Sequence, residues 1–468
     1  MPATPEAPAI VVDLPQQPPS QPPLPAPEEG HARGYVQPPF DMSHLDSQPV
    51  SALRAAGHPS AWDWRDQGKV TRVQNQDTCG ACYAFATLAS WESQLLIQEP
   101  GSPALDFSEN HAIECNYMQT GCWGDTIWGL MGLFSAHGAV LEADDPWNPA
   151  DQPCNQGAPY AKTATDMWVL AGGSTPPVDA LKDWLLAYGP LYVAMDSGEW
   201  PSAWANEFER YDGSYTLYYP VAQAQLRLNH AVLLVGWDDA LAHAGGKGAW
   251  IVKNSWGTEW GDDGYFTIAY NSAGLGSEAA LIRGWTNYAP NSVVLHNDEA
   301  GVRGWVGYDG VADAWVMARL VPDRNGYVTH VGVWTRDRVA DLDLYLYDSF
   351  DGQAPTGLLR PAIENVTLDY AGYHSIPISP PLQVASGNDV YVKVKYGYAS
   401  AIRGLPVDDQ SPIAARGSYI SPNGADGSWT ELSAGGGGMP ALDIGIRMRV
   451  VPLTTAKHRV GLPFITNK

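Results

Sequence analysis

The sequence has few basic residues and few charged residues of any kind. Its 468 residues include 27 Lys and Arg against 51 Asp and Glu, which gives a formal net charge of −24, and charged residues make up only 17% of the chain. A negative excess of this size repels a nucleic-acid backbone and an anionic membrane surface, and no run of Lys or Arg offsets it. We therefore expect no nucleic-acid partner.

The sequence also lacks a long apolar run. The nearest one, residues 127–141, is interrupted by Ser135 and His137, whereas a membrane helix needs about 18 or more apolar residues in succession. No Lys or Arg precedes Arg33, which is unlike the basic start of a secretory signal. We expect no membrane insertion and no such signal in this chain.

Proline and glycine, by contrast, are abundant, and their distribution divides the chain. The first 40 residues hold 12 of the 38 prolines, and all five cysteines lie between residues 58 and 290. A chain of this length is expected to form two or more domains. We predict a Pro-rich, disordered lead over residues 1–57, a mixed helical domain over 58–290, a strand-rich domain over 291–452 and a tail over 453–468.

The strand-rich domain shows a two-residue period. In residues 341–348 leucine alternates with Asp and Tyr, and in residues 389–396 valine alternates with Tyr and Lys. This pattern predicts strands with one buried face. Turn signals such as DRNG, SFDG and SPNG separate the strands, at intervals typical of an antiparallel β-sandwich.

One cysteine stands where a turn meets a helical pattern. Gly80 shortly precedes Cys82, and the residues that follow have the composition of a helix. At a helix N-terminus the helix dipole and a neighbouring imidazolium favour the thiolate, which is the nucleophilic form of cysteine. Taken alone, a cysteine of this kind is more often structural than catalytic.

Four motifs in order change that interpretation. CGACY at residues 79–83 fits the signature around the papain and cathepsin nucleophile. FSENHAIEC, NHAVLLVGW and IVKNSWGTEWGDDGYF follow it at plausible separations. Over residues 58–284 the chain therefore resembles the papain family of cysteine peptidases. The resemblance implies an α+β fold in which a helical lobe and a β lobe meet at a cleft.

The resemblance assigns a role to five residues. Cys82 becomes the nucleophile, His230 the general base and later acid, and Asn254 the residue that orients the imidazole. Trp256 covers their hydrogen bond, and Gln76 supplies the side-chain donor of an oxyanion hole. His230 follows Cys82 by 148 residues, within the spacing of about 130–150 typical of the family; the longer distance to Asn254 predicts an extended loop over residues 238–249.

The resemblance also implies two disulfides, Cys79 with Cys122 and Cys115 with Cys154. Disulfides persist in oxidising compartments, so we expect a secreted, periplasmic or cell-surface protein. A metal site is a poor alternative because no paired C-x-x-C motif and no nearby histidine cluster supply the ligands. We predict no metal and no cofactor.

The substrate-binding segment departs from the family pattern. Where relatives usually have two glycines whose backbone pairs with the substrate, this chain has Gly124 and Asp125, and Asn229 precedes the histidine where many relatives carry Asp. We expect these three residues to bind substrate. A charge from Asp125 at the cleft edge would favour basic or polar substrate residues. The short NYMQT segment leaves no room for the occluding loop of the exopeptidase branch, which favours endopeptidase action.

The strand-rich domain resembles the lectin-like β-sandwich that follows papain-like domains in some prokaryotic proteins. The resemblance rests on GWVGYDGVADAWVMARLVPDRNGYVTHVGVWT, YAGYHSIPI and SYISPNGADGSWTEL. Trp305, Trp334 and Tyr373 could stack on a sugar ring, or they could belong to the core or to the contact with the neighbouring domain. The latter interpretation is slightly favoured.

The sequence therefore predicts an α+β, papain-like peptidase followed by an all-β antiparallel sandwich. Its expected reaction is hydrolysis of peptide bonds in a protein or peptide substrate through an acyl-enzyme on Cys82. Residues 1–57 are a candidate pro-segment, with cleavage expected near residues 50–58. Two alternatives stay open, a glycan- or surface-binding protein with a degenerate peptidase half, and a Cys-His acyl transferase or transpeptidase.

Overall fold

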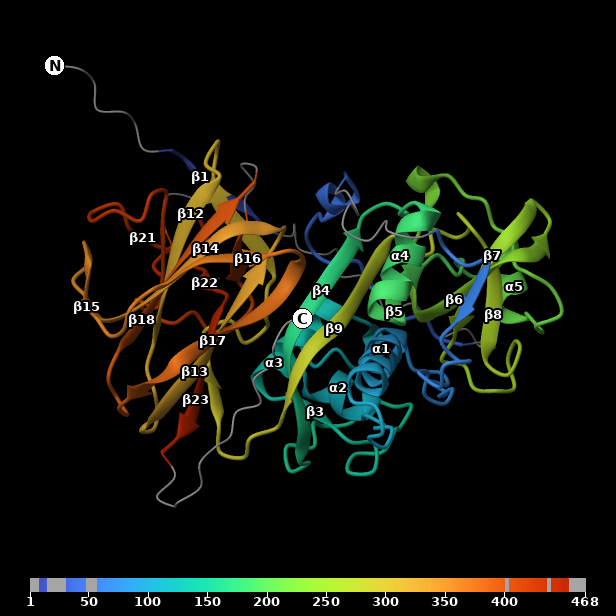
Figure 1. Cartoon of the computed structure of the whole chain (residues 1–468), viewed down its shortest axis with the longest axis horizontal. Helices are drawn as coiled ribbons and strands as arrows, with labels where there is room; N and C mark the ends of the chain where they lie inside the picture. Colours follow the sequence, from blue (N-terminus) through green and yellow to red (C-terminus); the bar gives the residue numbers. More distant parts are fainter. Residues whose placement is uncertain (1–7, 15–30, 48–56, 400–403, 436–438, 454–468) are drawn as a thin grey trace.

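The computed structural model describes residues 8–14, 31–47, 57–399, 404–435 and 439–453 (Figure 1). Within these ranges there are five α-helices: α1 (Cys82–Gln98), α2 (Glu109–Cys115), α3 (Ile127–Ala136), α4 (Val178–Tyr188) and α5 (Ala203–Glu209). Short 3₁₀ turns lie at Ser43–Ser47, Gly121–Trp123 and Gln223–Gln225. None of the helices described has the length and apolar character needed to cross a bilayer.

The strands of the first domain are β2 (Ala61–Asp63), β3 (Ala139–Val140), β4 (Tyr160–Gly172), β5 (Leu191–Met195), β6 (His230–His243), β7 (Gly246–Lys253), β8 (Tyr265–Ala269) and β9 (Glu278–Asn287). Those of the second are β10 (Val293–Leu295), β11 (Gly304–Tyr308), β12 (Asp313–Leu320), β13 (Gly326–Thr335), β14 (Val339–Phe350), β15 (Pro355–Leu358), β16 (Ile363–Leu368), β17 (Ala371–Val384), β18 (Val390–Tyr398), β19 (Leu405–Asp408), β20 (Ser418–Ser421), β21 (Thr430–Glu431), β22 (Asp443–Ile444) and β23 (Ile446–Pro452). Strand β1 (Ile10–Asp13) lies in the N-terminal lead.

Helix α1 is the central element of the first domain. It begins at Cys82, and its side chains from Cys82 to Leu95 are buried, so it lies between the other helices and the strands β5, β6 and β9. Helices α2 and α3 begin at side-chain caps, where Ser108 accepts from the backbone N–H of His111 and Thr126 from that of Trp128. These caps satisfy N–H groups that the first turn of a helix leaves unpaired. The first domain is therefore α+β, with a helical half and a β half.

The second domain is a sandwich whose strands follow the predicted two-residue period. Leu342, Leu344 and Leu346 of β14 are buried at 0 to 2% exposure, and so are the alternating valines of β18. A seven-stranded sheet with the order β15-β14-β18-β12-β20-β21, in which β16 also pairs with β14, forms one layer of the described part. The fold class predicted from the sequence is confirmed.

One sheet crosses from the first domain into the second. In the described residues it has the order β10-β23-β13-β17-β4-β9-β5-β6-β7-β8, with β2 and β3 at its sides. The crossing point is the antiparallel pair of β17 and β4, where Ala371 lies opposite Val169 and His374 opposite Asp166. The two domains thus share backbone hydrogen bonds, a contact that a two-residue pattern cannot reveal.

Aromatic side chains fill the contact between the domains. Trp305 and Trp334 are fully buried and Tyr373 is 3% exposed, and the Trp334 ring lies 6.2 Å from that of Trp128 in α3. Their proposed role as sugar-stacking residues is wrong, because no face of these rings is open to a ligand. The favoured interpretation, that they pack in the core and against the first domain, is confirmed.

Parts of the N-terminal lead are folded onto both domains, in contrast to the disordered lead that its proline content predicted. Strand β1 pairs antiparallel with β11, with Ile10 opposite Tyr308 and Asp13 opposite Trp305. Phe40, Met42 and Leu45 are buried at 7%, 1% and 6% exposure. The expected cleavage region, residues 50–58, lies almost entirely outside the described residues.

Candidate active site

The Cys82 thiol lies at the meeting point of helix α1 and strand β6. Its Sγ atom accepts hydrogen bonds from the backbone N–H of Ala231 at 3.4 Å and from that of Gly34 at 3.2 Å. Cys82 is fully buried and is the one cysteine of the five that forms no disulfide. The helix therefore presents the sulfur directly beside the backbone that follows His230.

His230 is oriented by Asn254 and covered by Trp256. The imidazole Nε2 lies 2.9 Å from Oδ1 of Asn254, and the Trp256 ring lies 5.1 Å from the imidazole ring, centroid to centroid. Because an amide oxygen can only accept, Nε2 carries the proton and Nδ1 is the basic nitrogen. Nδ1 has no hydrogen-bond partner among the described residues, so the thiol and the imidazole are not hydrogen-bonded to each other in this state.

The side-chain amide of Gln76 is held from both ends. Its Oε1 accepts from the Ser255 hydroxyl at 2.6 Å, and its Nε2 donates to the carbonyl oxygens of Cys79 at 2.8 Å and Ala32 at 2.9 Å. The amide is fully buried. A carbonyl oxygen of the N-terminal lead thus occupies the donor that the sequence assigned to an oxyanion hole.

Burial favours the neutral forms of both reacting groups. It raises the pKa of the Cys82 thiol to about 11, against the backbone N–H donors and the positive charge of Arg33, which lower it. It lowers the pKa of His230 to about 3, although the hydrogen bond to Asn254 raises it. In the covered state described here, the pair is therefore a thiol and a neutral imidazole.

Residues 31–36 cover the whole length of this site. The ring of His31 stacks on Trp256 with centroids 4.5 Å apart, and Gly34 lies over the thiol. A Cβ atom at Gly34 would come within 1.6 Å of the Gly80 carbonyl oxygen, so only glycine fits where the lead passes the turn at Gly80. The guanidinium of Arg33 pairs with Glu209 at 3.1 Å.

The segment pairs with the backbone at Asp125. The N–H of Asp125 donates to Gly34 O, and its carbonyl accepts from Val36 N, both at 3.1 Å. Gly124 faces the same stretch, since a Cβ there would lie 2.5 Å from Gly34 O. The carboxylate of Asp125 is buried and accepts from the N–H of Thr126 at 2.8 Å, at the start of α3. The sequence predicted a charge at the edge of the cleft. The Asp125 carboxylate does not supply it, because it is hydrogen-bonded at the N-terminus of α3.

The side chain of Tyr35 is buried at 6% exposure, and we call the space that it fills the Tyr35 pocket. The carbonyl of Asn229 accepts from the N–H of Tyr35 at 3.2 Å, and the phenol of Tyr35 donates to Oε2 of Glu278. The Asn229 side chain turns the other way and accepts from Ser197 N–H at 2.9 Å. Burial raises the pKa of Glu278 to about 7. The pocket therefore ends in a buried carboxyl group that accepts a hydrogen bond from a hydroxyl group.

Two disulfides flank the site on its helical side. Cys79 is joined to Cys122 and Cys115 to Cys154. The first lies between the nucleophile turn and the segment that carries Gly124. The sulfurs of Cys115 and Cys154 also lie close to a nitrogen of His111, but as a disulfide they offer no thiolate to a metal.

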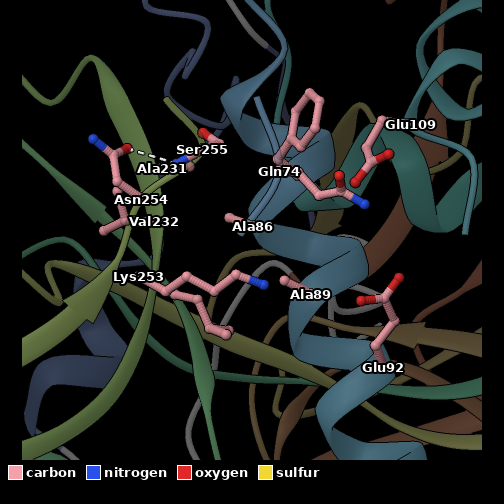
Figure 2. A pocket seen from close by; sticks show the side chains of 12 residues that line it. Gln74, Ala86, Ala89, Glu92, Glu109, Ala231, Val232, Lys253, Asn254 and Ser255 are labelled. Atoms are coloured by element: carbon pink, nitrogen blue, oxygen red, sulfur yellow. Dashed lines mark hydrogen bonds between the residues drawn. The ribbon is translucent and has the colours of Figure 1, made fainter. Parts of the chain in front are cut away.

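A small cavity of about 20 Å³ is lined by residues of α1, β6 and β7, among them Ala86, Val232 and Lys253 (Figure 2). This volume suffices for about one water molecule. The side chains of Glu92, Glu109 and Lys253 line it together with Asn254 and Ser255. Burial raises the pKa of Glu92 to about 7 and that of Glu109 well above its usual value, and it lowers the pKa of Lys253 to about 8.

Four further residues contact the site residues and were not predicted from the sequence. Ser255 positions Gln76, Ser197 braces Asn229, and Glu278 ends the Tyr35 pocket beside the buried Tyr192. Ser255 belongs to the NSWG motif and could have been found there. Glu278 and Ser197 stand in segments with no local signature, and only tertiary contacts identify them.

Comparison with known proteins finds two matched regions, and the boundary between them falls between the two domains of the structure. Residues 58–282 match the family described as "Papain family cysteine protease", and residues 295–437 match the "Lectin like domain" family. The viral cathepsin of Choristoneura fumiferana nuclear polyhedrosis virus is 35% identical over 224 residues, which cover 48% of this chain and 63% of that protein. The viral cathepsin of Autographa californica nuclear polyhedrosis virus is 33% identical over 228 residues, 47% of this chain and 64% of that protein. This chain therefore spans less than two thirds of these relatives.

Solved structures share the arrangement of both domains. The cysteine protease and lectin-like domains of Cwp84, a surface layer associated protein of Clostridium difficile, superpose with a TM-score of 0.70 at 19% identity, over 90% of this chain and 93% of that one. Clostridial Cwp84 after propeptide cleavage gives a TM-score of 0.65 at 20% identity, over 84% of this chain and all of that one. At this identity the likeness shows the fold alone.

Proposed function

We propose that the chain is a cysteine endopeptidase, because residues 58–282 match the papain family of cysteine proteases and residues 295–437 match the lectin-like domain family. Cys82 is its nucleophile, His230 its general base and acid, Asn254 the orienting residue and Gln76 a donor of the oxyanion hole. The observation that carries the proposal is a chain of contacts around Cys82. Its sulfur accepts from the N–H of Ala231, the residue after His230; His230 pairs with Asn254, and Gln76 donates to the carbonyl of Cys79, three residues before Cys82.

In the first step, Nδ1 of His230 takes the thiol proton and Sγ attacks the carbonyl carbon of the scissile bond. The developing oxyanion accepts from Nε2 of Gln76 and from the backbone N–H of Cys82. When the carbon–nitrogen bond breaks, His230 returns its proton to the leaving amine, and a thioester on Cys82 remains. The Asn254 oxygen keeps Nε2 protonated throughout.

In the second step, water replaces the amine. His230 takes a proton from the water as its oxygen attacks the thioester carbon, and the same oxyanion donors stabilise the second tetrahedral intermediate. Collapse releases the carboxylic acid and returns the proton to sulfur. Trp256, 2% exposed, shields the bond between His230 and Asn254 from competing water.

The direction of residues 31–36 supports a latent form. The leaving amine must lie beside His230, so a substrate runs with its acyl side along Asp125 and its amine side towards Trp256. The N-terminal lead runs the other way, with His31 on Trp256 and Val36 at Asp125. An N–H group and not a carbonyl carbon faces Sγ, so the segment blocks the site without being cut. Residues 1–57 thus act as a pro-segment, removed by cleavage near residues 50–58.

The test is labelling of the processed chain with an epoxysuccinyl thiol reagent, followed by peptide mapping and by assays on casein and on peptide amides. We expect the label on Cys82 and turnover that Cys82→Ala and His230→Ala abolish, while the control His243→Ala, at the far end of β6, leaves turnover unchanged. Label elsewhere, or none after the segment has left, would refute the site.

The two alternatives give different outcomes. A binding protein with a degenerate peptidase half would hydrolyse nothing, and the complete set of catalytic side chains argues against it. A transferase would form ligated product when an amine is added. An added amine that leaves the hydrolysis products unchanged supports the peptidase.

We propose a location outside the cytoplasm, on the surface or secreted, because both disulfides need an oxidising compartment. Carbohydrate binding by the lectin-like domain stays part of the proposal, with residues other than the buried Trp305, Trp334 and Tyr373. Half-buried Trp315 on the outer face of β12, 4.5 Å from Nζ of Lys393, is the better candidate for stacking on a sugar. Retention of the full chain on immobilised glycans, compared with Trp315→Ala, tests this.

A further inference from the structure

The N-terminal lead contacts the β-sandwich as well as the cleft. After crossing the catalytic site it places Phe40 between the domains, where its ring lies 5.2 Å from that of Trp128 in α3 and 5.5 Å from that of Trp305 in β11, both edge to face. Phe40 is 7% exposed. The Phe40 side chain of the lead thus packs partly against Trp305 of the sandwich.

Arg336, in the turn after β13, holds the lead at three points. Its Nη1 pairs with the Asp13 carboxylate at 2.9 Å, its Nη2 donates to the carbonyl of Asp41 at 2.8 Å, and its own carbonyl accepts from Nε2 of His44 at 2.9 Å. The residue is 9% exposed. Hydrogen bonds that involve a buried guanidinium are among the stronger ones in proteins, so these contacts contribute to affinity as well as to position.

Strand β1, which lies nearer the N-terminus, makes a further contact with the sandwich. It extends the sheet β1-β11-β19-β22 at the edge strand β11, and Figure 1 shows it beside the sandwich. Ile10, Val12 and Leu14 pack against the sandwich core. An extended segment that joins an exposed sheet edge is a common mode of peptide binding.

We propose that the β-sandwich is a second receptor for the pro-segment, built from strand β11, Trp305 and Arg336, and that it determines how long the peptidase stays latent. The inference rests on the proposed function and concerns the regulation of the same site. Two linked contacts bind more tightly than either alone, because the second forms at a high effective concentration. Cutting the chain within residues 48–56 leaves both contacts in place, so the cut segment remains on the cleft until the sandwich releases it.

The experiment uses the full chain with a recognition site for an added protease inserted within residues 48–56. After cutting, the rate of Cys82 labelling by the epoxysuccinyl reagent and the retention of the segment in gel filtration are followed together. In the wild-type sequence we expect slow labelling and co-elution of the segment. Phe40→Ala removes a buried ring and should speed labelling by about 10-fold or more, so that the segment elutes separately. Asp13→Asn weakens an ion pair whose carboxylate is 37% exposed and should speed labelling by about 2- to 5-fold.

The variants lie in two places, the lead and the sandwich. Phe40 and Asp13 lie in the part that is cut away, so the two variants leave the mature sequence identical. Val36→Ala removes a side chain that is 48% exposed and should not alter the rate. On the sandwich, Arg336→Ala should act like Asp13→Asn, whereas Arg338→Ala, which breaks the exposed ion pair with Asp369, should not.

A binding measurement separates this inference from the peptidase proposal. A fluorescent peptide of residues 8–47 is titrated onto the segment-free Cys82→Ala chain, which needs no activity. We expect at least 10-fold weaker binding of the Phe40→Ala peptide. Equal binding, equal labelling rates, or loss of the wild-type segment at once on cutting would overturn the second receptor. A segment-free chain that never labels would instead refute the peptidase.

Discussion

The Ser255 hydroxyl donates to Oε1 of Gln76 at 2.6 Å and thereby fixes the orientation of the amide group. With Oε1 engaged, the amide nitrogen points to the carbonyls of Ala32 and Cys79. The side chain is locked before any substrate arrives, and a fixed donor stabilises a developing oxyanion without reorganisation.

We predict that Gln76→Ala lowers kcat of the processed chain by about 10²- to 10³-fold, and that Ser255→Ala, which removes only the support, lowers it by about 10-fold. Both should leave KM for a peptide amide within a few-fold, because the donor acts on the transition state. Steady-state kinetics of the two variants check this. A loss confined to KM would contradict the assignment.

The Tyr35 pocket predicts a substrate preference. A substrate side chain that enters this pocket meets the Glu278 carboxyl group, so tyrosine should be preferred over phenylalanine by about 10- to 100-fold in kcat/KM. Glu278→Leu should reverse the order, because an apolar floor leaves the phenol unpaired. Paired peptide amides that differ only in this residue measure the ratio. A stronger preference for arginine in the wild-type chain would contradict the prediction.

The buried Glu92 predicts a stability slope with pH. Its pKa is raised to about 7 by burial from a usual value of about 4.5, so between these values the folded protein binds a proton that the unfolded chain has released. The free energy of unfolding should therefore fall as pH rises from about 4.5 to about 7, by about 3 kcal/mol.

Lys253 and Asp106 act on Glu92 electrostatically, Glu92 in turn raises the pKa of Glu109, and Glu278 titrates in the same range as Glu92. Glu92→Gln removes only the contribution of Glu92, so the difference between the two curves isolates it. Thermal unfolding of both proteins across pH 4 to 8 is the measurement. Parallel curves would show that Glu92 does not hold the proton.

Replacing Arg447 should lower the stability of the contact between the two domains. It is 1% exposed and donates to Ser135 Oγ and Gly132 O, both at 2.7 Å, while its Nε pairs with Asp298 at 3.1 Å. Arg447→Met leaves the buried Asp298 without its cation, which typically costs about 3–5 kcal/mol. Calorimetry should show a lowered Tm, and adding Asp298→Asn should recover part of it. No recovery would mean that lost packing, not the unpaired charge, is responsible.

The sequence predicts the proposed catalytic residues because each sits in a local motif whose residue types are set by the proposed chemistry. Cys82 lies in CGACY, and Asn254 and Trp256 lie in NSWG, so their positions needed no knowledge of tertiary contacts. The alternating strands around Leu344 and Val392 were predictable for a similar reason, since a buried face imposes a period of two.

The remaining features depend on partners far away in the chain. The ring of Trp305 packs against that of Trp128 in α3, far earlier in the chain, and no local pattern identifies that partner. Nothing in a Pro-rich composition indicates that residues 31–45 fit one cleft and one domain contact. The pairing of β17 with β4 likewise joins segments about 200 residues apart, which no local period can specify.

The β17–β4 pair has a mechanical consequence. A sheet that continues through a domain boundary resists bending there, so the second domain cannot swing freely as it would on a flexible tether. A surface bound by the second domain would then meet the proposed active-site cleft at one fixed angle.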